Sequence, residues 1–127
     1  MQVDIVTPEK VLFSQNDISM VTIPGIEGQM GILDNHVPVV TFMRPGIINI
    51  EDKKNRYFFT SGGVADFKNN ALSILCQEIY DIEKMTDQKI NQLKNNASLK
   101  IEDEKCTDHE AFISNIILEE LNLLKSR

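Results

Sequence analysis

The sequence is poor in the features that mark several large classes of protein. Acidic residues outnumber basic residues by 19 to 13, which gives a net charge of −6. Nucleic-acid binding depends on clustered lysine and arginine, so this charge balance argues against a nucleic-acid partner. No run of about 20 apolar residues is present, and we therefore expect no membrane-spanning helix. The first residues include an acid and no basic leader, which does not fit a signal peptide.

Cysteine and histidine are also scarce. The two cysteines, Cys76 and Cys106, and the two histidines, His36 and His109, are spread along the chain. Their spacing matches no pattern of zinc ligands, and the acids at 102–104 lack the alternation of a calcium loop. We therefore expect reduced thiols, no disulfide and no metal site.

Short apolar runs separated by turn residues fill the chain up to about residue 80. In the first runs apolar and polar residues alternate with a period of two, which is typical of half-buried strands. The apolar positions of the runs are Val3, Ile5; Val11, Phe13; Ile18, Met20, Val21, Ile23; Val37, Val39, Val40, Phe42, Met43; Ile47, Ile48, Ile50; Tyr57, Phe58, Phe59; Val64, Ala65, Phe67; and Ala71, Leu72, Ile74, Leu75. This pattern predicts an antiparallel sandwich or barrel, and the lack of intervening helices disfavours parallel βαβ units.

Characteristic residue pairs mark the turns between these runs. We expect Pro24-Gly25 and Pro45-Gly46 each to form a type II turn, in which proline fixes φ and glycine supplies a positive φ. Residues 52–55 predict a hairpin loop, and Gly62-Gly63 predicts a break in a strand. Asn69-Asn70 predicts a short turn, because asparagine tolerates left-handed conformations.

Near residue 83 the apolar period changes from two to 3.6. Thr86 is expected to cap a first helix, with Asp87 in its first turn. The apolar stripe of this helix consists of Ile90, Leu93 and Ala97. Residues 100–105 are expected to form a charged connector.

The second helix is expected to begin with a capping box, in which Thr107 is the cap and Glu110 lies three residues later. Its apolar stripe consists of Ile113, Ile116, Ile117, Leu121 and Leu124. Two helices with one stripe each and a short connector predict an antiparallel hairpin. The expected domains are therefore a β-sandwich over residues 1–83 and a helical hairpin over residues 84–127.

Residues 21–46 are the most distinctive stretch, and they invite two interpretations as a site. Gly25, Gly28 and Gly31 recur every third residue, but the lysine and hydroxyl residue that end a Walker loop are absent. His36 would need Asp34 to orient it and a nucleophile nearby to act as a general base. No such set is apparent, which favours an interaction module over a small-molecule-binding sandwich or an enzyme that uses His36.

The same stretch resembles the signature of the epsilon subunit of F-type ATP synthases, which is called delta in mitochondria. Order and spacing both match the family, and the resemblance covers residues 3 to about 80 densely. Residues 84–127 are similar in architecture only. The strings that carry the resemblance are residues 23–25, 27–33, 35–38 and 45–46, with 3–9 resembling the family's first strand and 61–66 its Gly-Gly strand.

The resemblance implies a ten-stranded β-sandwich followed by a C-terminal antiparallel α-helical hairpin. It implies a non-catalytic central-stalk subunit that binds gamma and the c-ring and helps couple proton-driven rotation to ATP synthesis. Such a subunit lies on the cytoplasmic face of the bacterial inner membrane without inserting into it, and no cofactor, metal or catalytic residue is implied. In bacterial members the hairpin can extend and restrain ATP hydrolysis, which would add the alpha and beta subunits as partners.

Position by position, the implied c-ring edge comprises Glu27, Gln29, Met30 and His36. Many bacterial members have an acid where this chain has Gln29, whose neutral amide still forms hydrogen bonds. The implied regulatory surface is the stripe of the second helix. The family's inhibitory helix is often rich in alanine and bases that meet an acidic partner segment. Residues 107–127 here carry four acids and two bases, and this charge disfavours inhibition.

Overall fold

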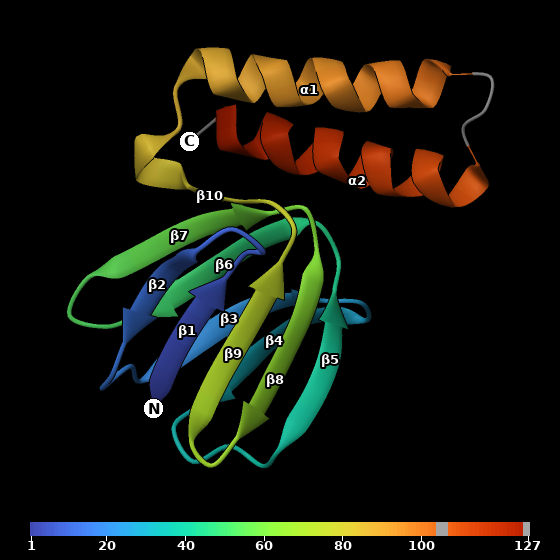
Figure 1. Cartoon of the computed structure of the whole chain (residues 1–127). Helices are drawn as coiled ribbons and strands as arrows, with labels where there is room; N and C mark the ends of the chain where they lie inside the picture. The colour runs from blue at the N-terminus through green and yellow to red at the C-terminus, as the bar shows by residue number, and fades with distance from the viewer. Residues whose placement is uncertain (104–106, 126–127) are drawn as a thin grey trace. The chain divides into compact units, whose positions relative to one another are not determined.

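The chain divides into two compact units, Met1–Ile82 and Glu83–Arg127. The computed structural model describes residues 1–103 and 107–125, and for residues 108–110, 112, 113 and 123–125 it describes the backbone alone. Strands make up the first unit, and both α-helices belong to the second (Figure 1).

Ten strands form the first unit, which confirms the sandwich expected from the sequence. They are β1 (Gln2–Val6), β2 (Val11–Gln15), β3 (Met20–Gly25), β4 (Gly28–Leu33), β5 (Val39–Met43), β6 (Gly46–Glu51), β7 (Asn55–Thr60), β8 (Gly63–Lys68), β9 (Ala71–Cys76) and β10 (Ile79–Asp81). Their order across the sheet is β10-β7-β6-β3-β5-β8-β9-β1-β2, and β4 pairs with β3 beside this path.

The strand pairs are antiparallel except for one. Residues Gln2 to Val6 of β1 run parallel to residues Ala71 to Leu75 of β9. The sequence pattern predicts antiparallel pairing throughout, and this pair differs from that expectation. The reason is that the alternation of apolar residues reports which face of a strand is buried, and it carries no information on the direction of the neighbouring strand.

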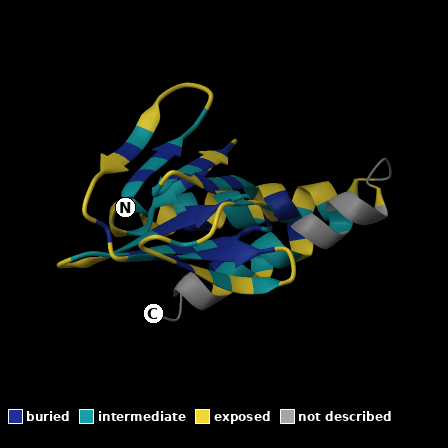
Figure 2. Cartoon of the chain, turned by 90° about the horizontal axis from the view of Figure 1, so that it is seen from below, coloured by how far each residue is buried: buried dark blue, intermediate teal, exposed yellow. Residues whose placement is uncertain are grey.

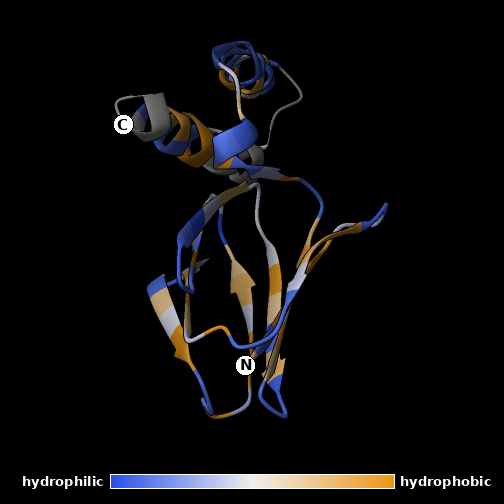
Figure 3. Ribbon diagram, turned by 90° about the vertical axis from the view of Figure 1, so that its left-hand side faces the viewer, coloured by the Kyte–Doolittle hydropathy of each residue, from blue (hydrophilic) through white to orange (hydrophobic). Residues whose placement is uncertain are grey.

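The strand β3 joins the two layers of the sandwich. Residues Met20 to Thr22 pair with β6, whereas Gly25 at the end of the same strand pairs with Met43 of β5. One layer therefore contains β10, β7, β6, β3 and β4, and the other contains β5, β8, β9, β1 and β2. In Figure 3 the strands of the sandwich are seen from the side, with apolar segments on both layers.

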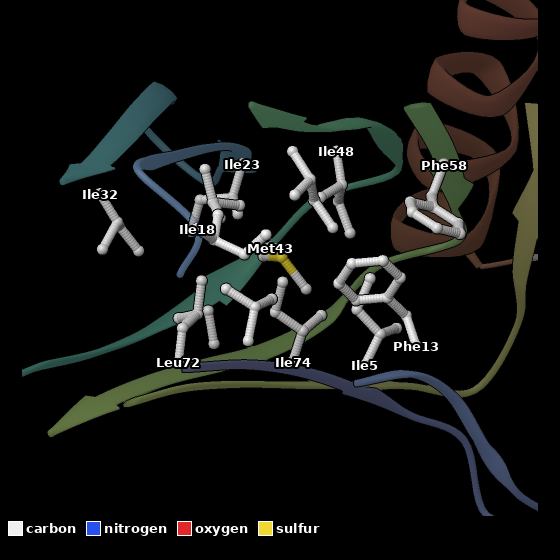
Figure 4. Packing of buried hydrophobic residues seen from close by; sticks show 14 of the residues in the cluster. Ile5, Phe13, Ile18, Ile23, Ile32, Met43, Ile48, Phe58, Leu72 and Ile74 are labelled. Atoms are coloured by element: carbon white, nitrogen blue, oxygen red, sulfur yellow. The ribbon is translucent and has the colours of Figure 1, made fainter. Parts of the chain in front are cut away.

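The hydrophobic core lies between these layers. Ile23, Ile48 and Phe58 from one layer approach Ile5 and Ile74 from the other (Figure 4). All five side chains are buried, and burial of each such side chain contributes about 1.5–3 kcal/mol relative to exposure. Buried positions alternate with more exposed ones along β1, β6 and β9, as the period of two predicts, and the loops are mostly exposed (Figure 2).

Two of the predicted turns are confirmed by their backbone angles. Asn69 and Asn70 have φ values of 52° and 55°, so both adopt the left-handed conformation between β8 and β9. Gly62 has a φ of 115° and separates β7 from β8. Residues 52–54 connect β6 and β7, which pair as the expected hairpin.

The prediction of a type II turn at each Pro-Gly pair is wrong. Pro24 and Gly25 lie within β3, and the chain turns instead at residues 26 and 27, with Gly28 at a φ of 135°. Gly46 begins β6 and has no positive φ, so it does not supply the corner of a type II turn. The strand β4 was not predicted, because its glycines suggested turns rather than a second arm of a hairpin.

Glycines in the strands permit close contact between backbones. A Cβ atom added to Gly25 would lie 2.7 Å from the carbonyl oxygen of Gly28, and one added to Gly63 would lie 2.1 Å from that of Leu75. Neither glycine has a positive φ, so the requirement is for space rather than for backbone freedom. A Cβ at Gly31 would instead meet only the terminal methyl group of Met20, at 3.0 Å.

The Gly63→Ala change is expected to destabilise the sandwich by about 1–3 kcal/mol, because the new methyl group collides with backbone that cannot move aside. Gly31→Ala is the matched control, since the flexible end of Met20 can rotate away. Urea unfolding followed by circular dichroism measures both costs. Equal stability of the two variants would show that the backbones of β8 and β9 can separate enough at Gly63 to accept a methyl group.

The second unit is the helical hairpin, formed by α1 (Asp87–Glu102) and α2 (Asp108–Lys125) after a short 3-10 helix, η1 (Ile82–Lys84). Thr86 caps α1 as predicted, because its hydroxyl accepts a hydrogen bond of 3.2 Å from the Lys89 N–H. The connector predicted over residues 100–105 is too long, since α1 continues to Glu102. The backbone N–H of Ala111 donates to the Thr107 carbonyl at 3.0 Å, while the Glu110 side chain of the predicted capping box lies outside the described residues.

The apolar stripes of the two helices are only partly covered. Ile90, Ala97 and Leu121 are buried, and Leu93 is half-buried. Ile116 and Ile117 are also half-buried, whereas the side chains of Ile113 and Leu124 lie outside the described residues. Within the described part of the chain, neither helix has the length and apolar character that a membrane crossing would require.

Candidate docking surface

The hairpin of β3 and β4 presents a polar tip at residues 26–29. Pairing of Pro24 with Gln29 and of Ile23 with Met30 fixes the register of the two strands. The alternation along β4 then turns Met30 toward the core and leaves Gln29 exposed. Glu27, in the turn itself, is also exposed. Three residues of the predicted c-ring edge are thus neighbours at one tip.

An open groove of about 550 Å³ lies beside this tip, between residues 25–30 and residues 40–42 of β5. We call it the tip groove. Its apolar lining includes Ile26 and Phe42, whose side chains are 61% and 64% exposed. The described strands include only β3 as a partner of β4, so the other edge of β4 keeps unpaired backbone groups. Apolar side chains next to free backbone groups suit contact with another protein chain.

His36 lies at the other end of β4. Six residues of β4 separate it from the tip, a length of about 17–20 Å. Its backbone N–H donates to the Leu33 carbonyl at 3.1 Å, which closes a tight turn. The structure therefore brings Glu27, Gln29 and Met30 together, but it does not bring His36 into the same cluster.

The His36 side chain is held by two contacts. Its ring packs edge-on against Phe67 of β8, with the ring centroids 5.9 Å apart. Its Nδ1 atom lies 2.7 Å from the Val37 carbonyl oxygen, and because a carbonyl only accepts, Nδ1 must be the donor. The general-base hypothesis needed Asp34 in that place. His36 and Asp34 do not pair in the structure. The hypothesis of an enzyme that uses His36 therefore lacks the acid that would orient the imidazole.

Asp34 instead binds the amino group of Met1. The Met1 ammonium lies 2.9 Å from Asp34 Oδ1 and 3.0 Å from the Ile18 carbonyl oxygen. The Asn70 side chain also hydrogen-bonds the Asp34 carboxylate. The ammonium group, followed by Asn70, holds the pKa of Asp34 below its ordinary value of 3.8, against a small opposing effect of burial.

Asp34 gives the sandwich a pH-dependent contribution to stability. Because its pKa is lower in the folded state, its carboxylate stabilises the fold above pH 3.8, and this contribution disappears as the pH falls through the folded-state pKa. We expect Asp34→Asn to lower the free energy of unfolding at pH 7 and to have little effect near pH 2. Urea titrations at the two pH values measure the difference.

Asn16→Ala, which changes an exposed side chain that cannot titrate, is the control for this prediction. Its effect should be the same at pH 7 and pH 2. A pH-independent effect of Asp34→Asn would contradict the ion pair with Met1.

The other chemistry considered from the sequence finds no site among the described residues. No group of three or more His, Cys, Asp and Glu residues is placed to hold a metal ion in residues 1–103 and 107–125, as far as their side chains are described. Cys76 is a buried free thiol that accepts a hydrogen bond from Thr60 at 3.1 Å, and burial raises its pKa. The glycine-rich segment is a β-hairpin with no helix after it, so it lacks the helix N-terminus of a phosphate loop.

Sequence reasoning missed an exposed apolar surface on the sandwich. Phe42 of β5, Val64 of β8 and Leu75 of β9 stand opposite one another in the strand register. Phe42 is 64% exposed and Leu75 is 50% exposed, and Val40 lies on the same face two residues from Phe42. We call these four residues the outer apolar face. The alternation along β5 indicates this surface, because the side chains of Val40 and Phe42 lie on one face of the strand and the buried Met43 lies on the other.

Comparison with known proteins assigns the fold to a family. The family model for the beta-sandwich domain of the ATP synthase delta/epsilon chain matches residues 1–82. The chain belongs to this family. It is 34% identical over 113 residues to the ATP synthase epsilon chain of Pelagibacter ubique, and the alignment covers 88% of this chain and 87% of the relative.

Other members of the delta/epsilon family extend the match to mitochondria and to solved structures. ATP synthase subunit delta of Schizosaccharomyces pombe is 33% identical, over 90% of this chain and 71% of the relative. A chain of the Euglena gracilis mitochondrial ATP synthase has a TM-score of 0.73 at 23% identity, over 98% of this chain and 78% of that chain. A chain from the Tetrahymena thermophila central stalk and c-ring has a TM-score of 0.69 at 13% identity, over 97% and 94%. At these identities the two structures show the shared fold.

Proposed function

We propose that the chain is a non-catalytic subunit of the central stalk of an F-type ATP synthase, where it binds gamma and the c-ring and helps couple proton-driven rotation to ATP synthesis. The match of the whole sandwich to the delta/epsilon family carries this proposal. The similar Tetrahymena chain comes from a structure described as central stalk and c-ring, which agrees with it. The subunit would act peripherally, on the cytoplasmic face of a bacterial inner membrane.

The chemistry of the site supports a docking role rather than a catalytic one. Asp34, the only acid close to His36 in the sequence, is engaged by the Met1 ammonium. His36 is engaged by a backbone carbonyl and by an aromatic ring. These contacts fix the shape of a surface, and they leave His36 without the orienting acid that the general-base hypothesis needed.

The tip of the β3–β4 hairpin is the proposed contact with the c-ring. Glu27 and Gln29 offer a carboxylate and an amide, both exposed, to the polar loops of the ring. Met30 supports them from the core side of β4. His36 borders the same edge at the far end of β4, flanked by Leu33 and Val37, which are 57% and 70% exposed.

The outer apolar face is the proposed contact with gamma. Phe42, Val64 and Leu75 form a row across three neighbouring strands, and an exposed apolar row of this kind is typical of a protein interface. Aromatic residues near the centre of an interface often dominate its binding energy. Phe42 is therefore the residue expected to contribute most.

Phe42→Ser should weaken the complex with gamma about tenfold, because loss of a buried aromatic contact commonly costs more than 1 kcal/mol. Surface plasmon resonance with immobilised gamma measures the affinity. Leu33→Ser is the matched control, because Leu33 is 57% exposed but lies on β4, in the other layer of the sandwich. Unchanged binding by the Phe42 variant would count against the outer apolar face, and failure of the unaltered chain to bind gamma would count against the function.

The helical hairpin has a separate proposed role. Contact with the alpha and beta subunits, and restraint of ATP hydrolysis, would involve the stripe of α2 that includes Ile116, Ile117 and Leu121. The acidic balance of residues 107–127 disfavours strong restraint against an acidic partner segment. The hairpin is therefore expected to have a weak effect on hydrolysis.

Deletion of residues 83–127 should leave a folded sandwich that still binds gamma, since the core cluster of the sandwich draws only on residues before position 80. Hydrolysis of ATP by the reassembled enzyme should not rise markedly. Circular dichroism, gamma binding and a phosphate-release assay test the three expectations in turn. A large rise in hydrolysis would assign a restraining role to the hairpin despite its charge.

A further inference from the structure

The turn between β8 and β9 is connected to the segment that carries His36. We call residues 34–38 the His36 segment. The Oδ1 atom of Asn70 accepts a hydrogen bond of 2.8 Å from the backbone N–H of Asn35, and the Asn70 side chain also binds the Asp34 carboxylate. These two residues immediately precede His36. One side chain, 35 positions beyond Asn35, thus holds the start of the segment at two successive residues.

Asparagine fits this position for three reasons at once. The backbone of Asn70 has a φ of 55°, a left-handed conformation that asparagine tolerates better than most residues. Its side-chain carbonyl accepts from Asn35, and its amide group can donate to Asp34. Glycine would keep the backbone conformation but would lose both contacts, and aspartate would accept but could not donate. The neighbouring Asn69 shares the left-handed conformation, with a φ of 52°, but has no part in these two contacts.

The restraint on Asn35 extends to His36. Asn35 also has a left-handed backbone, with a φ of 62°, which is uncommon outside glycine. That conformation closes the turn in which the His36 N–H reaches the Leu33 carbonyl, and it directs the chain so that the ring of His36 meets Phe67 edge-on. Removal of the Asn70 side chain would free Asn35 to leave the left-handed region, and the His36 ring would lose its fixed direction.

We propose that Asn70 is a positioning residue, which holds the His36 segment in the conformation that docks to the c-ring. The inference rests on the proposed function, because it requires that His36 lies at the contact with the c-ring. Asn70 itself acts through Asn35 and Asp34. Its contribution to docking should therefore depend on the presence of the His36 side chain.

A double-mutant cycle tests this dependence with the full-length chain. The variants are Asn70→Gly, His36→Ala and the combination of both, and Asn69→Gly is the matched control in the same turn. Affinity is measured for an assembled complex of gamma and the c-ring. Asn70→Gly and His36→Ala should each weaken binding about tenfold, and the double variant should be weaker by far less than the product of the two effects. Asn69→Gly should bind as the unaltered chain does.

Hydrogen exchange provides a readout that a general loss of stability would not produce. The Asn35 amide should exchange faster in Asn70→Gly than in Asn69→Gly, while amides in the core strand β9 exchange alike in both variants. Faster exchange throughout the sandwich would instead assign Asn70 a role in overall stability and would overturn the inference.

The outcomes separate the inference from the proposed function. If His36→Ala leaves binding unchanged, the docking role of His36 fails, and the inference fails with it. If His36→Ala weakens binding but the effect of Asn70→Gly is absent or fully additive, the docking role stands and the positioning role of Asn70 is wrong. Strong non-additivity, together with local exchange at Asn35, supports both.

Discussion

The sharing of β3 between two layers is the constraint on which the sandwich depends. One edge of β3 pairs with β4, and the other is divided between β6 and β5. At the end of β3, Gly25 pairs with Met43 of β5 and also closes the hairpin with Gly28, where a Cβ atom would lie only 2.7 Å from a carbonyl oxygen. The turn that carries Glu27 follows directly. The contact that joins the layers therefore also fixes the direction of the proposed c-ring tip.

Apolar residues serve two different purposes in the sandwich. Those between the layers, such as Ile5, Ile48 and Ile74, are fully buried and stabilise the isolated fold. Those on the outer apolar face, above all Phe42, remain largely in water and give the isolated chain little stability. These side chains contribute favourable free energy only when another surface covers them. Their exposure therefore indicates a surface that binds a partner.

Local patterns in the sequence predicted the features that local physics controls. Alternation identified most strands, Thr86 identified the start of α1, and Asn69-Asn70 identified a left-handed turn. The hairpin of β3 and β4 was missed because its glycines suggested turns, whereas Gly25 lies within a strand and provides space for a close backbone contact. The bonds from Asp34 to the Met1 ammonium and to Asn70 span more than 30 positions in the chain, and no local pattern encodes them. The tip residues were predicted by resemblance, but the distance from the tip to His36 required the structure.

The parallel pairing of β1 with β9 has a consequence for how the molecule forms. Residues 2–6 find their neighbours at residues 71–75, so about the first 70 residues must leave the ribosome before β1 gains its parallel partner. Closure of so long a loop is entropically costly, and such non-local pairing slows folding. During synthesis the apolar side chains of Val3 and Ile5 remain without their neighbours on β9 until that strand has been made. One edge of β1 can therefore pair early with β2, whereas its other edge stays open until β9 has been made.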